Sequence, residues 1–307
     1  MGTMIQSYNL NENDFRGNKF KNHKSPLKGN NDLLSITKPE IIKEIHKGYL
    51  DAGADIIETN TFSSTSIAME DYDMQDYVYD LNFESARIAK EVAKKYSTKK
   101  YVAGAIGPTN KTASMSPDVN DPGFRAITFD ELVDTYTEQV RGLVDGGCDM
   151  LLVETIFDTL NAKAALMSIS NYFEENKINL PLMVSGTITD QSGRTLSGQT
   201  LNAFLISLSH FPIMSIGLNC ALGADQLTPY LRRLSDNTEF YVSTHPNAGL
   251  PNAFGEYDQT PKEMLNQIRV YLKENLINIV GGCCGTTYDH IRLIAEEVKK
   301  YKPRKVK

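Results

Sequence analysis

The chain has 307 residues with a formal net charge of -6, and its only basic run is the tail Lys299 to Lys307, so we expect no nucleic-acid partner. No apolar run approaches the roughly 18 residues that span a bilayer, and the N-terminus lacks the charged and apolar regions of a secretory signal, so we expect no membrane association. Four cysteines are too few for a disulfide scaffold in a chain of this length, which favours a reducing, cytoplasmic setting.

Strand-like and helix-like segments alternate along the chain. After one predicted helix at about 38–52, seven short runs are almost continuously apolar, as is typical of buried parallel strands. These runs are ADIIET (54–59), YVAGAIG (101–107), DMLLVET (149–155), PLMVSGT (181–187), MSIGLNC (214–220), FYVSTH (240–245) and INIVGG (277–282). The intervening periodicity predicts helices at 77–96, 129–145, 158–175, 223–235, 260–274 and 287–300.

Two of these predicted helices have clear start signals. Thr128 is followed three residues later by Glu131, the pattern in which a hydroxyl and a carboxylate cap each other's backbone N–H groups. Thr260 is followed by Pro261 at the first helical position and by Glu263 at the third.

The alternation predicts an α/β fold with a parallel sheet covered by helices, in a single domain spanning 1–307. A doubly wound open sheet is the competing architecture, but no G-x-G-x-x-G motif follows an early strand. The ends of the runs favour a (β/α)8 TIM barrel, because in that fold they meet at one face, where active sites are built. The run ends carry Glu58-Thr59-Asn60, Gly107-Pro108-Thr109, Glu154-Thr155, Gly186-Thr187, Asn219-Cys220, His245-Pro246-Asn247 and Gly281-Gly282-Cys283-Cys284.

Three cysteines stand at the ends of the predicted strands. Cys220 ends one strand, and the pair Cys283-Cys284 ends the strand two further on. Three thiolates that converge in this way make a zinc site with one open position, as catalytic zinc sites have. The alternatives are that small buried cysteines fill core space, which we expect for Cys148, or that the adjacent pair forms a disulfide.

The all-sulfur ligand set indicates which chemistry such a metal would support. Three anionic sulfurs make zinc a poor Lewis acid for activating water, whereas a thiol bound as the fourth ligand would ionise near neutral pH and stay nucleophilic. The pattern therefore favours alkyl transfer to a thiol over hydrolysis. The five histidines form no H-E-x-x-H or H-x-H pair of the kind found in hydrolytic zinc sites.

Three further features have both a functional and a structural interpretation. Glu154 follows the apolar run MLLV, so it either holds the ammonium group of an amino-acid substrate or caps the next helix. Asn247 is either a turn residue or a polar group that reaches the metal or the substrate, and His245 is expected to be structural. The loop 107–126 is long and rich in turn-forming residues, and such loops within compact domains tend to be functional.

The cysteine segments GLNCALGADQL and NIVGGCCGTT resemble the homocysteine-binding zinc domain of cobalamin-dependent methionine synthase. The same resemblance extends over essentially the whole chain. It includes ADIIETNTF, GPTNKTASMSPDVNDPGFR, VETIFDTLNAKAA, SGTITDQSGRTLSGQT and HPNAGLPNAFGEYD. The cysteine pattern alone is shared with the wider homocysteine S-methyltransferase family, including betaine- and S-methylmethionine-dependent enzymes, whereas the longer strings point to the cobalamin-dependent branch.

The resemblance implies a cytoplasmic methyltransferase of methionine biosynthesis. It would transfer a methyl group from methylcobalamin, and ultimately from 5-methyltetrahydrofolate, to homocysteine, giving methionine and cob(I)alamin. Carried over by the matching motifs, Cys220, Cys283 and Cys284 would bind Zn²⁺, and Glu154 would contact the homocysteine amino group. Asn247 is the further candidate for contact with the substrate.

The chain departs from the family pattern in two places. Family members begin with an apolar strand ending in Asp-Gly-Gly ahead of the segment that here reads Met1-Gly2-Thr3-Met4, so the resemblance implies a barrel without its first strand and without the Asp that helps to bind the substrate amine. The folate-binding, cobalamin-binding and reactivation modules of the full enzyme are also not in this sequence. We therefore expect the methyl donor to come from a separate cobalamin-binding protein or module.

Overall fold

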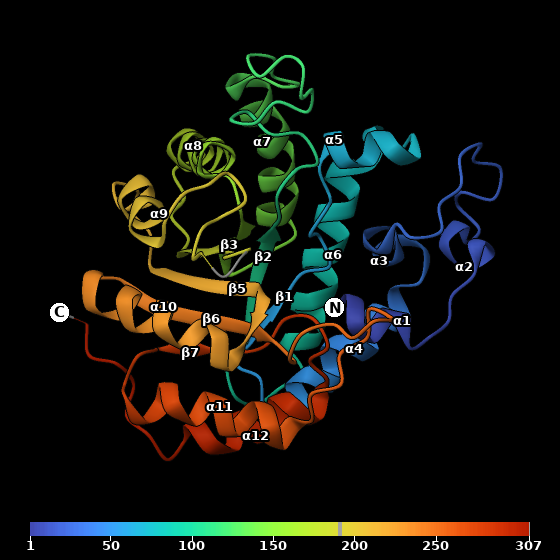
Figure 1. Ribbon diagram of the computed structural model, residues 1–307. Coiled ribbons are helices and arrows are strands. Elements are labelled where there is room, and N and C mark those ends of the chain that lie inside the picture. The colour runs from blue at the N-terminus through green and yellow to red at the C-terminus, as the bar shows by residue number, and fades with distance from the viewer. Residues whose placement is uncertain (190–191, 307) are drawn as a thin grey trace. The chain divides into compact units, whose positions relative to one another are not determined.

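The computed structural model describes residues 1–189 and 192–306 and contains a parallel sheet with helices between its strands (Figure 1). Asp190 and Gln191, within the quoted string SGTITDQSGRTLSGQT, and Lys307, the last residue of the basic tail, lie outside the described residues. The strands are β1 (Ile56–Glu58), β2 (Tyr101–Ile106), β3 (Met150–Ile156), β4 (Leu182–Gly186), β5 (Ser215–Gly223), β6 (Tyr241–Asn247) and β7 (Ile279–Val280). Each coincides with one of the seven apolar runs, so all seven strand predictions are confirmed.

The order of the strands distinguishes the two candidate architectures. They follow one another in the sheet in chain order, β1-β2-β3-β4-β5-β6-β7. A doubly wound sheet reverses its strand order at a switch point, whereas a (β/α) barrel does not. The structure therefore agrees with the barrel type among the α/β folds. The described residues supply seven strands, and the expectation of a (β/α)8 barrel that lacks its first strand stays a prediction.

In the described residues, helices precede β1 and follow each of the strands. The longer ones are α4 (Pro39–Asp51), α6 (Val78–Ala93), α7 (Phe129–Asp145), α8 (Thr159–Asn176), α10 (Ala224–Asn237), α11 (Pro261–Lys273) and α12 (Tyr288–Val298), and all seven were predicted. The shorter ones are α1 (Gly2–Gln6), α2 (Glu12–Arg16), η1 (Asn31–Leu33), α3 (Leu34–Thr37), α5 (Ser66–Met69), η2 (Glu70–Tyr72), η3 (Gln75–Tyr77) and α9 (Leu201–Leu208). None of the shorter ones was predicted, because one or two turns give too few residues for a periodic pattern.

Both predicted helix starts are present. The Thr128 hydroxyl accepts a hydrogen bond from the backbone N–H of Glu131, whose carboxylate accepts one from the backbone N–H of Thr128. The Thr260 and Glu263 side chains make the same reciprocal pair at the start of α11, where Pro261 is the first residue. These local patterns fix the first turns of α7 and α11.

The described chain divides by its contacts into two compact units. Unit 1 comprises Met1–Leu50, Asp55–Val153 and Leu160–Pro181, and it contains β1 and β2, which pair in parallel, and the first part of β3, which pairs with β2. Unit 2 comprises Asp51–Ala54, Glu154–Thr159 and Leu182–Lys307, and it contains β4 to β7, again paired in parallel. The predicted cysteine cluster lies entirely in unit 2.

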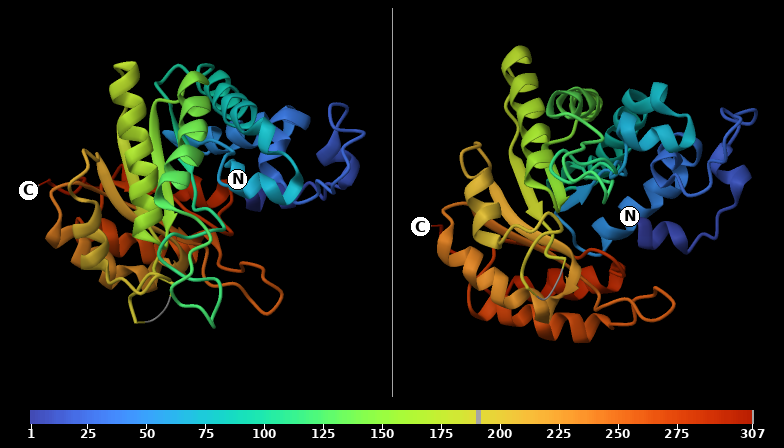
Figure 2. Two further views of the ribbon diagram at one scale, coloured as in Figure 1. Left: turned by 90° about the horizontal axis from the view of Figure 1, so that it is seen from above. Right: turned by 45° about the horizontal axis from the view of Figure 1, so that its top comes forward.

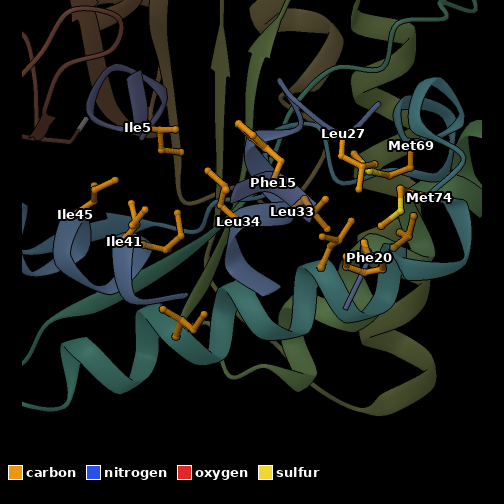
Figure 3. Close-up of a cluster of buried hydrophobic side chains, with 14 residues drawn as sticks. Ile5, Phe15, Phe20, Leu27, Leu33, Leu34, Ile41, Ile45, Met69 and Met74 are labelled. Carbon is orange, nitrogen blue, oxygen red and sulfur yellow. The ribbon is translucent and has the colours of Figure 1, made fainter. Parts of the chain in front are cut away.

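Unit 1 has a core of apolar side chains brought together from its N-terminal helices and α6. Figure 3 shows this cluster, in which Phe15 and Leu33 from the N-terminal segment lie near Leu34 of α3, with Met69 and Met74 at one end. These five side chains are at most 4% exposed. Their burial accounts for the order of the N-terminal segment, whose helices of four or five residues would not be stable in isolation.

Unit 2 is built from β4 to β7 and the helices between them. Helix α10 packs against β5 and β6, and α11 packs between α10 and α12, as the views in Figures 1 and 2 show. Helix α10 begins at Ala224, directly after the last residue of β5, so the strand end and the helix start are held together. No helix of the described residues combines the length and the apolarity needed to cross a bilayer.

Candidate metal centre

Three cysteines lie together at the ends of two strands of unit 2. Cys220 lies in the C-terminal part of β5, and Cys283 and Cys284 follow β7. The Sγ atoms of Cys220 and Cys284 are 3.7 Å apart, and all three sulfur atoms lie within 4.8 Å of one another. The structure therefore brings together the three residues that the sequence singled out as candidate zinc ligands.

The sulfur geometry fits a tetrahedral metal site. Zinc–sulfur bonds of about 2.3 Å at tetrahedral angles place two ligand sulfurs about 3.8 Å apart. The separation of 3.7 Å between Cys220 and Cys284 agrees with this, and Cys283 lies close enough to complete the set. Three soft donors with one position left open are the ligand set of a catalytic rather than a closed structural zinc site.

The proximity of the thiols changes their acidity. Hydrogen bonds from Cys220 and Cys283 lower the pKa of Cys284 to about 2, because they stabilise its thiolate. Hydrogen bonding with Cys220 and Cys284, together with burial, raises the pKa of Cys283 well above its usual value. The cluster thus holds one thiolate, at Cys284, that the other two thiols stabilise, and a bound cation would replace the protons that the sulfurs otherwise share.

The backbone at the end of β5 turns Cys220 toward the cluster. Cys220 has φ +60° and Ala221 has φ +57°, both in the left-handed region that costs a side-chain-bearing residue about 1–2 kcal/mol. The regular register with β6 is interrupted between Asn219 and Gly223. Two consecutive left-handed residues at a strand irregularity are the kind of strain that proteins keep at functional sites.

Backbone hydrogen bonds hold the Cys283-Cys284 segment against the end of β6. The N–H of Cys283 donates to the carbonyl of Pro246 at 2.8 Å, and the N–H of Cys284 donates to Asn247 Oδ1 at 3.1 Å. The N–H of Ala248 donates in return to the carbonyl of Cys284 at 2.9 Å. Asn247 is 1% exposed, and its side chain here holds the backbone of the candidate ligand Cys284.

Tyr257 contacts the cluster from a loop. Its hydroxyl donates a hydrogen bond to Cys284, and burial together with the charge of Cys284 raises the pKa of Tyr257 to about 12. Gly285 has φ +77°, and a Cβ atom at this position would lie 2.3 Å from Cβ of Tyr257. Glycine is therefore required at 285, both for the left-handed conformation and for the close approach of the tyrosine.

Asn219 connects the cluster to the end of β3. Its Nδ2 atom lies 3.9 Å from Cys283 Sγ and 2.8 Å from Thr155 Oγ1. Its Oδ1 atom accepts hydrogen bonds from the Thr155 N–H at 3.0 Å and from the Ser185 hydroxyl at 2.7 Å. The side chain is 2% exposed, so these contacts are shielded from water.

Glu154 lies directly before this connection. It is half-buried near the end of β3, and the Thr155 hydroxyl lies 3.4 Å from its Oε2 atom. Glu154 and the three cysteines are thus carried by one unit and are linked through Thr155 and Asn219. The role of Glu154 in binding an ammonium group stays a prediction.

Two other sequence-derived candidates belong to unit 1, whereas the cluster belongs to unit 2. Cys148 is 6% exposed in unit 1, and burial raises the pKa of its thiol to about 12, as expected for a cysteine that fills core space. The loop 107–126 also belongs to unit 1, where the N–H of Ala113 in this loop donates to Asn161 Oδ1 at 2.9 Å. A function for this loop stays a prediction.

Sequence reasoning did not assign a role to Asn219, Thr155, Ser185 or Tyr257. Asn219 and Thr155 were visible as polar residues at strand ends, and that position was the available signal. Tyr257 carries no such signal, because its contact with Cys284 depends on how a loop of irregular structure folds back.

Comparisons with known proteins bear on the family and the fold of this chain. A family model described as homocysteine S-methyltransferase matches residues 1–298. The homocysteine methyltransferase MmuM from Escherichia coli, in its metallated form, is 21% identical, with 97% of this chain and 93% of that chain covered and a TM-score of 0.73. A B12-independent methionine synthase from Shewanella sp. W3-18-1, in complex with selenomethionine, is 13% identical, with 91% and 93% covered and a TM-score of 0.51. At these identities the solved structures show a shared fold.

Proposed function

Since the chain belongs to the homocysteine S-methyltransferase family, we propose that it transfers a methyl group to the thiol of homocysteine at the cluster of Cys220, Cys283 and Cys284, giving methionine. The observation that carries this proposal is the convergence of three sulfur atoms within 4.8 Å at the ends of β5 and β7. We propose further that the whole chain acts as one homocysteine-binding domain.

The three cysteines would hold a zinc ion. Zinc bound there would act as a Lewis acid that lowers the pKa of the homocysteine thiol while leaving the sulfur nucleophilic. The all-sulfur ligand set supports this chemistry over water activation, because three thiolates leave the metal with little positive charge. The left-handed Cys220 and the hydrogen bonds to Cys283 and Cys284 orient the ligands before substrate arrives.

Glu154 would bind the ammonium group of homocysteine through its carboxylate. It belongs to the same unit as the cysteines, and Thr155 and Asn219 link it to Cys283. A fixed ammonium group and a fixed thiol together orient the sulfur toward the methyl donor. In the transfer a sulfur–carbon bond forms, the bond from the methyl group to its donor breaks with its electron pair left on the donor, and the thiol proton passes to solvent.

For the methyl donor we propose methylcobalamin carried by a partner protein or module. The support is the resemblance of the strings GPTNKTASMSPDVNDPGFR and HPNAGLPNAFGEYD to the cobalamin-dependent branch. The second candidate is a donor other than cobalamin, such as S-methylmethionine or betaine. It is favoured by the likeness in fold to a chain of similar length, MmuM, and to a methionine synthase described as B12-independent.

The experiment is methionine formation by purified, zinc-loaded protein with homocysteine and one donor at a time. Methionine from methylcobalamin supports the first candidate, and methionine from S-methylmethionine or betaine alone supports the second. No methionine from any of the three would refute methyl transfer to homocysteine by this chain.

Two cysteine variants test the metal site separately from the donor. We expect about one zinc per chain in the wild type and loss of most of it in Cys283→Ala, because two sulfurs cannot hold the ion tightly. The matched control is Cys148→Ala, which removes the fourth thiol from a buried position in unit 1 and should keep its zinc. Equal zinc content in the two variants, measured by atomic absorption, would contradict the assignment.

A further inference from the structure

The amide of Asn219 uses its whole hydrogen-bonding capacity inside the site. An asparagine side chain can donate two hydrogen bonds and accept two. Its two N–H groups face Thr155 Oγ1 and Cys283 Sγ, and its oxygen accepts from the Thr155 N–H and the Ser185 hydroxyl. Because the Thr155 N–H can only donate, the oxygen must face it, and this fixes the NH2 group toward the cysteine sulfur.

Thr155 adopts a conformation that needs such support. Its φ is +54°, in the left-handed region that is disfavoured for a β-branched residue. Asn219 bonds both to its backbone N–H, at 3.0 Å, and to its hydroxyl, at 2.8 Å. The direction in which the neighbouring Glu154 carboxylate points therefore depends on the amide of Asn219.

Asn219 also precedes the strained turn that carries Cys220. It is the last residue of β5 in regular register with β6 before the irregularity, and Cys220 and Ala221 follow it with left-handed φ. A buried side chain anchored on β3 and β4 at this point limits the ways in which the turn can relax. One residue thus acts on two of the candidate ligands, on Cys220 through the backbone and on Cys283 through its sulfur.

We propose that Asn219 is a positioning residue that holds the cysteine cluster and the Glu154–Thr155 segment in fixed relation, through its N–H···S contact and its paired bonds to Thr155. This proposal rests on the proposed function, since it concerns the same site. Asparagine suits the role because an aspartate would lack the two donors. A serine would be too short to span from β5 to both Thr155 and Cys283.

The first test compares zinc affinity in three proteins by competition with a chelator. We expect Asn219→Leu, which removes every polar contact at similar volume, to raise the zinc dissociation constant about 10–100-fold. Ser185→Ala removes one hydrogen bond to the Asn219 oxygen and leaves both N–H contacts. We therefore expect its zinc dissociation constant to change by less than about threefold, below the roughly 10–100-fold range for the loss of groups that support a metal ligand. An equal loss of affinity in both variants would mean a general packing role and would overturn the proposal.

The second test uses a variant that keeps the acceptor contacts. Asn219→Asp retains an oxygen for the Thr155 N–H and for Ser185 but cannot donate to Cys283, so it should fold even if Asn219→Leu does not. In the Co²⁺-substituted protein we expect the sulfur-to-cobalt charge-transfer band to move to longer wavelength, because losing a donor raises the energy of the sulfur lone pairs. A folded Asn219→Asp protein with an unchanged band would overturn the proposal.

The kinetic readout separates positioning from metal loss. With zinc saturating and whichever donor the wild type accepts, we expect the KM for homocysteine in Asn219→Leu to rise at least about tenfold, because both bonds from Asn219 to Thr155, the residue after Glu154, are lost. An unchanged KM would remove the link to Glu154. If the wild type makes no methionine with any donor, the proposed function fails, whereas zinc affinity and the cobalt spectrum still decide the role of Asn219.

Discussion

Replacing Gly285 by alanine should destabilise the protein and weaken zinc binding by more than the cost of placing alanine in a left-handed backbone conformation. Gly285 has φ +77°, and Gly255 has φ +79° in the same unit, so both alanines would meet the same left-handed backbone. That conformation costs a side-chain-bearing residue about 1–2 kcal/mol. The two sites differ in their surroundings, because a Cβ at 285 would lie 2.3 Å from Cβ of Tyr257, while a Cβ at 255 would meet nothing within 4 Å.

The extra cost at Gly285 follows from that contact. Carbon atoms in contact normally lie about 3.5–4.0 Å apart, so Tyr257 or the Cys284-Gly285 segment must move by more than about 1 Å. Overpacking of this kind typically costs about 1–3 kcal/mol. We therefore expect Gly285→Ala to lower the free energy of unfolding by about 2–5 kcal/mol and Gly255→Ala by about 1–2 kcal/mol.

The assay is urea denaturation of both zinc-free variants, followed by zinc titration against a chelator. Because Tyr257 hydrogen-bonds to Cys284, its displacement in Gly285→Ala should also weaken zinc binding about 10–100-fold, with no such effect in Gly255→Ala. Equal free energies of unfolding within about 0.5 kcal/mol, together with equal zinc affinities, would refute the packing argument.

Two further predictions concern buried charged residues. Burial raises the pKa of Asp32, which accepts from the Ser63 N–H, from 3.8 to about 6, so the folded state holds a proton that the unfolded state has lost between about pH 4 and 6. As the pH rises through that window, the free energy of unfolding of the wild type should therefore fall by about 3 kcal/mol relative to that of Asp32→Asn. If urea denaturation gave the same pH dependence for both proteins, the argument would be contradicted. Arg304 is 5% exposed and donates hydrogen bonds to the backbone carbonyls of Ser235 and Phe240. Arg304→Ala should therefore lower the free energy of unfolding, measured by urea denaturation, by about 3–5 kcal/mol and leave the zinc content unchanged. A decrease of less than about 1 kcal/mol would count against this reasoning.

Much of unit 2 could be predicted because its signals are local. A run such as MSIGLNC is buried on both faces and therefore almost continuously apolar, which identifies β5 without knowledge of its neighbours. Thr260 and Glu263 are three residues apart, so their mutual capping at the start of α11 needs no tertiary contact. The metal cluster was predictable for a related reason, since parallel strand ends meet at one edge of a sheet and three of these residues were cysteines.

The remaining features depend on contacts between segments far apart in the chain. Helices α1, α2 and α3 are too short to show a period, and they are ordered by burying their apolar side chains in one cluster with residues of α4 and α6. The expectation of a missing first strand concerns residues ahead of Met1 and stays a prediction.

The sequence by itself determined the strands, the long helices and the three cysteines, because each of these depends on residue type and short-range spacing. Only the tertiary structure decided that the Asn219 amide bridges Thr155 and Cys283, and that Tyr257 reaches Cys284. Those contacts join residues up to 64 positions apart, and their existence depends on side-chain direction and on left-handed turns that no local pattern encodes.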